Sequence, residues 1–164
     1  MTSTFGTTVK VSIFGESHAP KIGCTIEGLP AGFSIDLAAL KTFLQRRSPS
    51  HPWDTPRKET DDPLFVSGIS AEGILDGSPL TAELPNTNVR PQDYAATKLV
   101  PRPGHADFAA WAKWGDSYTQ TGGGHFSARL TAPLCIAGGI ALQILRAQCI
   151  TIAAHVLKIK NIND

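Results

Sequence analysis

Three groups of polar residues in this sequence carry chemistry that packing does not explain. Ser17 and His18 stand together in a Gly-Glu-Ser-His segment. A basic group lies before and within a proline-rich stretch and comprises Arg46, Arg47, Arg57 and Lys58. Two glycine-punctuated stretches, 102–107 and 122–129, form the third group. Arginine binds phosphates and carboxylates through paired hydrogen bonds, glycine-loop N–H groups cradle anions, and histidine exchanges protons near neutral pH. These residue types together predict a site for a small, multiply anionic substrate.

Each group also has a plainer interpretation. Arg46 and Arg47 end a predicted helix, where the helix dipole alone favours cations. The triple glycine at 122–124 matches neither dinucleotide-binding nor P-loop spacing and is typical of a flexible turn. Lone loop histidines are more often surface residues than catalysts, and we assign His51 and His155 to that class. On the residues alone, both interpretations stay open.

Composition narrows the class of protein. The chain has 164 residues, a formal net charge of +1 and 18% charged residues, with 15 glycines and 12 prolines. A nearly balanced charge argues against nucleic acid or an anionic membrane as partner, since both need a concentrated basic face. Three widely spaced cysteines form neither a disulfide framework nor a zinc site, so no metal is expected. The N-terminus lacks an apolar signal region, and we expect a reduced, cytoplasmic protein of a single domain spanning 1–164.

The elements that position these residues can be predicted from periodicity. Alternating apolar residues at 9–13 and 22–26 predict a hairpin with the Gly-Glu-Ser-His segment in its loop. A helix follows, with Ser34 as its cap and Leu37, Leu40 and Leu44 on one face. Residues 48–63 form a long loop, of the kind that usually serves a site.

From residue 64 onward, the sequence pattern predicts two strands, two helices and a further strand. Strands are expected at 64–69 and 80–84, and a short helix capped by Asp107 places Trp111 in the core. Thr131 is the expected N-cap of a long buried helix that is too short to cross a bilayer. The alternation at 150–154 predicts a strand. Because the segment from Leu130 to Leu157 carries only one formal charge, we expect it to be covered by other parts of the protein on nearly every side. Cys135 and Cys149 are expected to be small buried hydrophobic residues.

Six short motifs follow one another along the chain. They are F-G-E-S-H, L-x-R-R-x-P, T-P-R-K-E, V-S-G, R-P-G-H-A-D and G-G-G-x-x-S-A-R. Their order and wording resemble the chorismate synthase family over essentially the whole chain, from Phe5 to about Leu157. The most specific pair is G-E-S-H with R-P-G-H-A-D at this separation.

The resemblance implies a fold and an activity. Chorismate synthases have an α+β fold of layered strands and long helices, usually assembled as a homotetramer. They eliminate phosphate from 5-enolpyruvylshikimate 3-phosphate to give chorismate, using reduced FMN, and feed aromatic amino acid biosynthesis as the last step of the shikimate pathway. Some members also use NADPH to reduce the flavin in place. The resemblance thus predicts a carbon–oxygen lyase.

The resemblance also assigns roles to individual residues. His18 matches the histidine that protonates the leaving phosphate, His105 the histidine that lies against the flavin, and Ser17 a serine that relays protons. The substrate-binding arginines match Arg46, Arg47 and Arg129. The cofactor-binding positions match Arg47, which is linked to NADP, together with Ser127 and His125.

This sequence departs from the family pattern in two respects. His125 and Phe126 replace an arginine and a serine of the usual G-G-G-R-S-S-A-R, so backbone donors and His125 are expected to take over the flavin contacts there. Family members are also about twice as long, which leaves three explanations: a truncated gene product, one piece of a split enzyme, or a shortened relative without catalysis that binds flavin or phosphate or assists assembly. A generic phosphate-binding domain is a weaker alternative.

Overall fold

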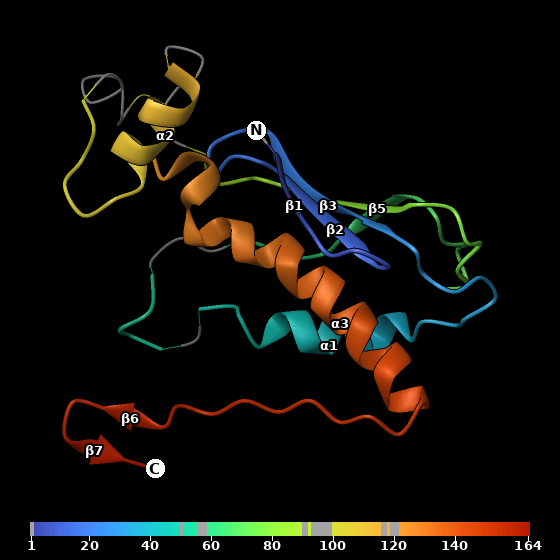
Figure 1. Cartoon of the computed structure of the whole chain (residues 1–164). Coiled ribbons are helices and arrows are strands. Elements are labelled where there is room, and N and C mark those ends of the chain that lie inside the picture. The colour runs from blue at the N-terminus through green and yellow to red at the C-terminus, as the bar shows by residue number, and fades with distance from the viewer. Residues whose placement is uncertain are drawn as a thin grey trace.

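The computed structural model of the chain describes residues 2–49, 51–55, 59–89, 92, 100–115, 118 and 122–164. Its centre is an antiparallel sheet of five strands in the order β1-β2-β3-β5-β4. The strands are β1 (Thr2–Phe5), β2 (Lys10–Gly15), β3 (Lys21–Glu27), β4 (Leu64–Ser67) and β5 (Leu80–Pro85). Helices α1 (Leu37–Gln45) and α3 (Thr131–Ala147) lie under one face of this sheet (Figure 1). The fold is α+β, as predicted.

The predicted hairpin is confirmed, because β2 pairs with β3 in an antiparallel register that sets Val11 opposite Ile26. Alternation places the apolar side chains of both strands on the face toward the helices, where Ile22 is fully buried. The opposite face carries small polar residues, such as Thr25, whose hydroxyl lies 3.2 Å from that of Thr81. The hydrophobic core therefore lies between the sheet and the helices.

Helix α1 is capped two residues later than predicted. Asp36, and not Ser34, is the N-cap, and its carboxylate accepts a hydrogen bond of 2.8 Å from the backbone N–H of Ala39. Both residues suit the position, but Ser34 forms a β-bridge with Ile74 and the N–H of Ile35 donates to the Gly73 carbonyl at 2.8 Å, so this stretch pairs with 73–74 and the helix starts only after Asp36.

Helix α3 packs on both the sheet and α1. Its buried face comprises Ala132, Pro133, Ile136, Ala137, Gly139 and Ile140. Gly139 makes the closest approach to α1, since a Cβ there would lie 2.5 Å from Leu40 Cδ1. The stretch Ala128–Ala147 is long and apolar enough to cross a bilayer, so the expectation that it is too short is wrong, and 44% of its apolar window is buried inside the protein. Thr131, predicted as the N-cap, is the first helical residue and donates its hydroxyl to the Ala128 carbonyl at 2.6 Å.

The C-terminal segment differs most from prediction. Residues 150–157 form no strand and are exposed, and only the two-residue strands β6 (Lys158–Ile159) and β7 (Ile162–Asn163) follow. The segment runs apart from the helices (Figure 1), so its alternating pattern meets no strand with which to pair among the described residues. Cys149 is exposed as well, which makes the prediction of a buried cysteine wrong there.

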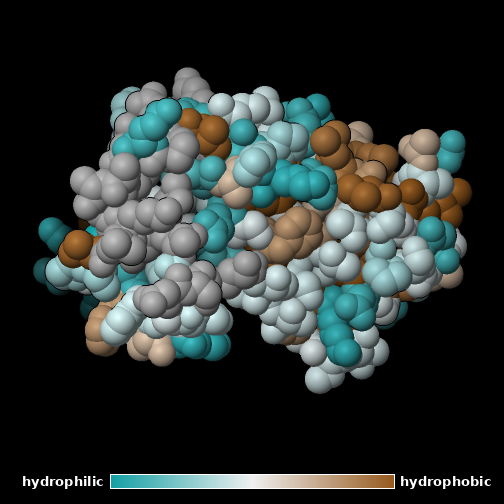
Figure 2. Space-filling view, turned by 90° about the horizontal axis from the view of Figure 1, so that it is seen from above, coloured by the Kyte–Doolittle hydropathy of each residue, from teal (hydrophilic) through white to brown (hydrophobic). Residues whose placement is uncertain are grey.

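Helix α2 (Asp107–Trp114) projects from one end of the molecule and leaves large side chains in solvent. Phe108 is 63% exposed and Trp111 50% exposed, so the predicted core position of Trp111 is wrong. The helix instead buries Asp107 and Ala110. Seen from above (Figure 2), hydrophobic residues gather mainly at the end of the molecule away from α2.

Candidate active site

The glycine loop at 122–124 brings the two halves of the chain together. Gly122 and Gly124 have φ values of +65° and +54°, which favour glycine. A Cβ on Gly122 would lie 2.5 Å from Cδ2 of His18, so the imidazole packs directly on this glycine. The backbone N–H of Ser17 donates to the Gly124 carbonyl at 3.0 Å. The loop between β2 and β3 is therefore held against the glycine loop.

His125 fixes the glycine loop from behind. The residue lies in the 3-10 helix η3 (Gly124–Phe126) and is only 7% exposed. Its Nδ1 lies 2.9 Å from the carbonyl of Gly15, which can only accept, so Nδ1 is the protonated nitrogen. Nε2 then accepts from the hydroxyl of Ser3 at 2.8 Å. Both ring nitrogens are engaged with the protein, which makes His125 a link between η3 and the first two strands.

A second network surrounds the buried carboxylate of Asp107. Arg102 donates to Asp107 Oδ2 from Nε at 2.6 Å and to Oδ1 from Nη2 at 3.0 Å. His105 Nδ1 is hydrogen-bonded to the same Oδ1. The Arg102 guanidinium is the main reason that the pKa of Asp107 falls to about 2. Arg102 Nη2 also donates to the Gly122 carbonyl at 2.7 Å and so joins this network to the glycine loop.

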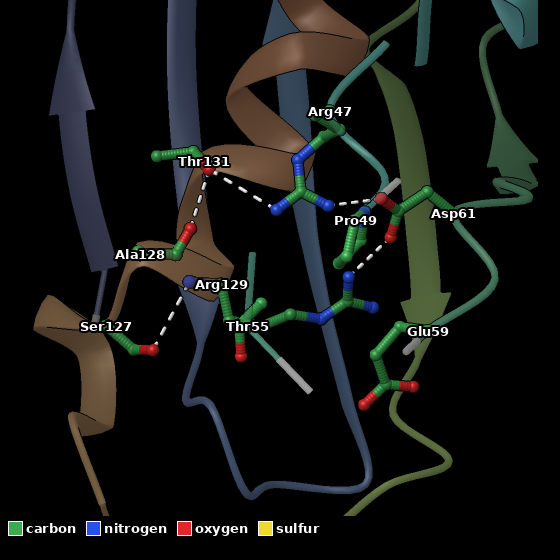
Figure 3. A pocket seen from close by; sticks show the side chains of 9 residues that line it. All are labelled: Arg47, Pro49, Thr55, Glu59, Asp61, Ser127, Ala128, Arg129 and Thr131. Carbon is green, nitrogen blue, oxygen red and sulfur yellow. Dashed lines mark hydrogen bonds and ion pairs between the residues drawn. The ribbon is translucent and has the colours of Figure 1, made fainter. Parts of the chain in front are cut away.

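Two arginines converge on one carboxylate in a pocket lined by described residues. Arg47 follows α1, and Arg129 lies in the 3-10 helix η4 (Ala128–Leu130). Each pairs with a different oxygen of Asp61, whose side chain is only 4% exposed (Figure 3). The cavity has a volume of about 320 Å³, and its lining is completed by Pro49, Thr55, Glu59, Ser127, Ala128 and Thr131. The arrangement concentrates donors for an anion while Asp61 balances their charge.

Some of these donors remain unused. Arg129 Nη2 and Arg47 Nε are buried and have no hydrogen-bond partner among the described residues. A buried donor without a partner costs roughly 1–3 kcal/mol, so such atoms in a pocket indicate a place where a ligand can accept. Arg129 Nη2 is therefore the donor best suited to an incoming anionic oxygen.

Asn86 connects the arginine pocket to the loop between β2 and β3. Its Oδ1 accepts from Arg129 Nε at 3.0 Å. Its Nδ2 donates to the carbonyls of Glu16 at 3.2 Å and Ala19 at 2.8 Å. The residue is only 8% exposed. Through Asn86, the positions of Arg129 and of the segment that carries Ser17 are set by one side chain.

Glu59 orders the far side of the pocket. Its carboxylate accepts from the backbone N–H and hydroxyl of Thr87, at 2.9 and 2.7 Å, and from the N–H of Asn88 at 3.2 Å. With Asp61, it offsets the charge of the two arginines that line the same cavity. The pocket is thus rich in charged donors but close to neutral as a whole.

The structure brings most of the predicted site residues into two connected clusters. Ser17, His18 and His105 belong to the elements that meet at the glycine loop, while Arg47, Ser127 and Arg129 line the pocket. Arg46 is not brought in, because it is exposed and its guanidinium lies 5.6 Å from the centroid of the Phe43 ring. Two of the predicted basic residues, Arg57 and Lys58, lie outside the described residues. No group of three metal-binding side chains occurs among the residues described.

Sequence reasoning missed Asp61 and Asn86. The side chain of Asp61 is 4% exposed and lines the pocket, and the buried Asn86 accepts from Arg129 beside it. In the sequence, Asp61 stands in a run of acidic residues and Asn86 follows a strand. A polar residue directly after a buried strand was the available signal for Asn86. For Asp61, the sequence holds no signal, because its partners Arg47 and Arg129 are 14 and 68 positions away.

Comparison with known proteins gives a consistent set of relatives. The family model described as chorismate synthase matches residues 9–164. A chorismate synthase of Lancefieldella parvula is 89% identical over 164 residues, which is the whole of this chain and 43% of that protein. Those of Chitinophaga pinensis and Aeropyrum pernix are 43% and 38% identical over 143 and 156 residues. The chain thus spans less than half of the length of these curated relatives.

A solved structure supports the fold. A crystal structure of a chorismate synthase matches with a TM-score of 0.56 and 19% sequence identity, covering 87% of this chain and 35% of that protein. At this identity the match concerns the arrangement of strands and helices alone.

Proposed function

The chain belongs to the chorismate synthase family, and from this premise we propose that it forms part of an enzyme that converts 5-enolpyruvylshikimate 3-phosphate to chorismate. The relatives are lyases of aromatic amino acid biosynthesis. The observation that carries the proposal for this chain is the convergence of Arg47 and Arg129 on Asp61, with Arg129 Nη2 left unpartnered at a pocket of about 320 Å³. A small anion whose oxygen accepts from Arg129 Nη2 suits such a site.

In the proposed reaction, a 1,4-elimination breaks the bond between the ring carbon and the phosphate oxygen and removes a ring proton. Arg47 and Arg129 hold the anionic groups of the substrate through charge-assisted hydrogen bonds. His18 gives a proton to the departing phosphate, which makes the phosphate a better leaving group. Ser17, the neighbour of His18 in the loop that packs on Gly122, relays protons between the site and its surroundings.

The residues present fit a flavin. The hydroxyl of Tyr118 is buried without a described partner beside Gly124, and the rings of Trp114 and Phe126 lie 6.5 and 6.2 Å from that of Tyr118. Such a cluster suits a planar aromatic group with polar edges. Ser127 and His105 would hold FMN, while His125 holds the glycine loop in position. When bound, reduced FMN supplies electron density to the substrate as phosphate leaves.

The finer properties of the family extend the proposal. Arg47 would contact NADPH if the flavin is reduced in place, and a cytoplasmic homotetramer is the expected state of the whole enzyme. Arg46, whose side chain is turned toward Phe43, would reach the substrate only after a change of rotamer.

The proposal is tested with a hybrid protein, in which this chain is continued by the part of the Lancefieldella parvula relative that it does not match. The hybrid is incubated anaerobically with reduced FMN and 5-enolpyruvylshikimate 3-phosphate, and phosphate release is measured. We expect release that is lost with His18→Ala and kept with His155→Ala, an exposed control 69% accessible at its side chain. Binding of flavin without any release would instead favour a non-catalytic module.

A further inference from the structure

We propose that Asp107 is a positioning residue that fixes the tautomer of His105, and that Arg102 anchors this carboxylate and couples it to the glycine loop. The inference rests on the proposed function, in which His105 acts at the flavin. It assigns two residues that the family resemblance gave no role.

The hydrogen bond between His105 and Asp107 has one possible donor. Asp107 is completely buried, and its pKa of about 2 keeps it ionised at neutral pH, so both oxygens only accept. His105 Nδ1 is hydrogen-bonded to Oδ1. A nitrogen lone pair facing a carboxylate oxygen would be repelled, so Nδ1 must carry the hydrogen. In the neutral ring, Nε2 is then the free lone pair.

Arg102 offers an alternative partner for the ring. Its Nη2 lies 3.3 Å from His105 Nδ1, which would require Nδ1 to accept and Nε2 to carry the proton. The same Nη2 is nearer to Asp107 Oδ1, at 3.0 Å, and to the Gly122 carbonyl, at 2.7 Å. Two good acceptors already use this donor, so the geometry favours the tautomer with the proton on Nδ1.

Arg102 holds the carboxylate of Asp107 in place. Its Oδ2 accepts from the backbone N–H of Arg102 at 3.1 Å and from Nε at 2.6 Å. With Nη2 on Oδ1, the guanidinium grips both oxygens and leaves the carboxylate one orientation. Arg102 Nη2 also donates to the carbonyl of Gly122. Arg102 and Asp107 therefore connect the ring of His105 to the loop against which His18 packs.

The arrangement suits the proposed chemistry. The side chain of His105 is 28% exposed while its partner is fully buried, so the imidazole lies at a boundary between the protein interior and solvent. With Nδ1 committed to Asp107, any exchange of protons with a ligand must pass through Nε2. A carboxylate–histidine pair of this kind orients the ring and selects the reactive nitrogen in other enzymes.

Asp107→Asn separates this role from simple packing, because the amide keeps the shape of the carboxylate. Its single oxygen is best placed at the Oδ2 position, where two donors of Arg102 converge. The NH₂ group then opposes one donor, Arg102 Nη2, and faces His105 Nδ1, which must accept, so the neutral ring moves its proton to Nε2. The reverse placement would oppose the NH₂ group to two donors and is less favourable.

The test uses the 164-residue chain labelled with ¹⁵N-histidine, studied by long-range ¹H–¹⁵N NMR at about pH 9, well above the ordinary histidine pKa of about 6.5. We expect His105 of the unmodified chain to show the Nδ1–H tautomer and His105 of Asp107→Asn to show the Nε2–H tautomer. His125 is the internal control, because its Nδ1 donates to Gly15 in both proteins. An Nε2–H tautomer in the unmodified chain overturns the proposal, even if the variant does not fold.

A kinetic measurement on the hybrid protein completes the test. With Asp107→Asn we expect kcat for phosphate release to fall on the order of 10³-fold or more, as for other carboxylate–histidine pairs, with KM little changed. An active hybrid whose kcat survives the substitution refutes the positioning role. A hybrid that releases no phosphate in any form refutes the proposed function instead, while the tautomer experiment still decides the inference.

Discussion

Replacing Gly122 with alanine should displace His18 while leaving the fold in place. The left-handed φ of +65° costs an alanine about 1–2 kcal/mol. The new Cβ would lie 2.5 Å from His18 Cδ2 and 2.6 Å from Nε2. Ordinary contact begins at about 3.5 Å, so the imidazole must move by roughly 1 Å. A misplacement of that size in catalytic machinery costs on the order of 10²-fold in rate.

Gly32→Ala is the matched control for this change. Gly32 has a similar φ of +78°, and a Cβ there would have nothing within 4 Å. Both variants should lose about 1–2 kcal/mol of unfolding free energy, measured by urea titration with tryptophan fluorescence. Only Gly122→Ala should shift the His18 ring signals in NMR and lower phosphate release by the hybrid about 10²-fold. Unchanged His18 signals, or equal activity of the two variants, would refute the contact between His18 and the glycine loop.

Three further predictions concern stability. Asp61→Asn should lower the unfolding free energy by about 3 kcal/mol because it leaves buried charges unpaired, whereas Asp62→Asn, at an exposed ion pair, should change it by less than about 1 kcal/mol; equal urea midpoints would contradict this. Asp107 has a folded pKa of about 2, below its unfolded value of about 3.9, so it stabilises the fold by roughly 2–3 kcal/mol above pH 4, and this contribution should vanish as pH falls toward 2; a parallel pH titration of Asp107→Asn should lack that component. Gly139→Ala should lower Tm because its Cβ would meet Leu40 at 2.5 Å, while Gly138→Ala, with nothing within 4 Å, should raise stability by up to about 1 kcal/mol; calorimetry giving the same sign for both would argue against the packing of α1 on α3.

Local patterns predicted the elements whose partners are close in sequence. Strands β2 and β3 are joined by a short loop, so alternation and a glycine-containing turn were enough to predict their pairing. Helix α3 was predictable because its apolar composition and Pro133 in the first turn agree with a buried helix. The order of the short motifs supplied the family.

Long-range interactions decided the features that prediction missed. The role of Asp61 depends on two arginines from distant segments. The local sequence does not distinguish Asp61 from Asp62, which forms an exposed ion pair with Lys41. The capping of α1 depended on the pairing of Ser34 and Ile35 with residues 73–74, which delays the start of the helix until after Asp36. The alternation at 150–154 matched a strand, but a strand requires a partner that the described residues do not provide.

The central claim is that Arg47, Arg129 and the histidines of this chain serve a phosphate elimination. It is tested most directly by following the hybrid protein with reduced FMN and 5-enolpyruvylshikimate 3-phosphate, and by measuring phosphate and chorismate in the same sample. We predict one phosphate released for each chorismate formed, and loss of both products with Arg129→Ala, which removes a pocket-lining guanidinium with a buried, unpartnered Nη2. A folded hybrid that forms neither product, or an Arg129→Ala variant that forms both at the unmodified rate, would contradict the account.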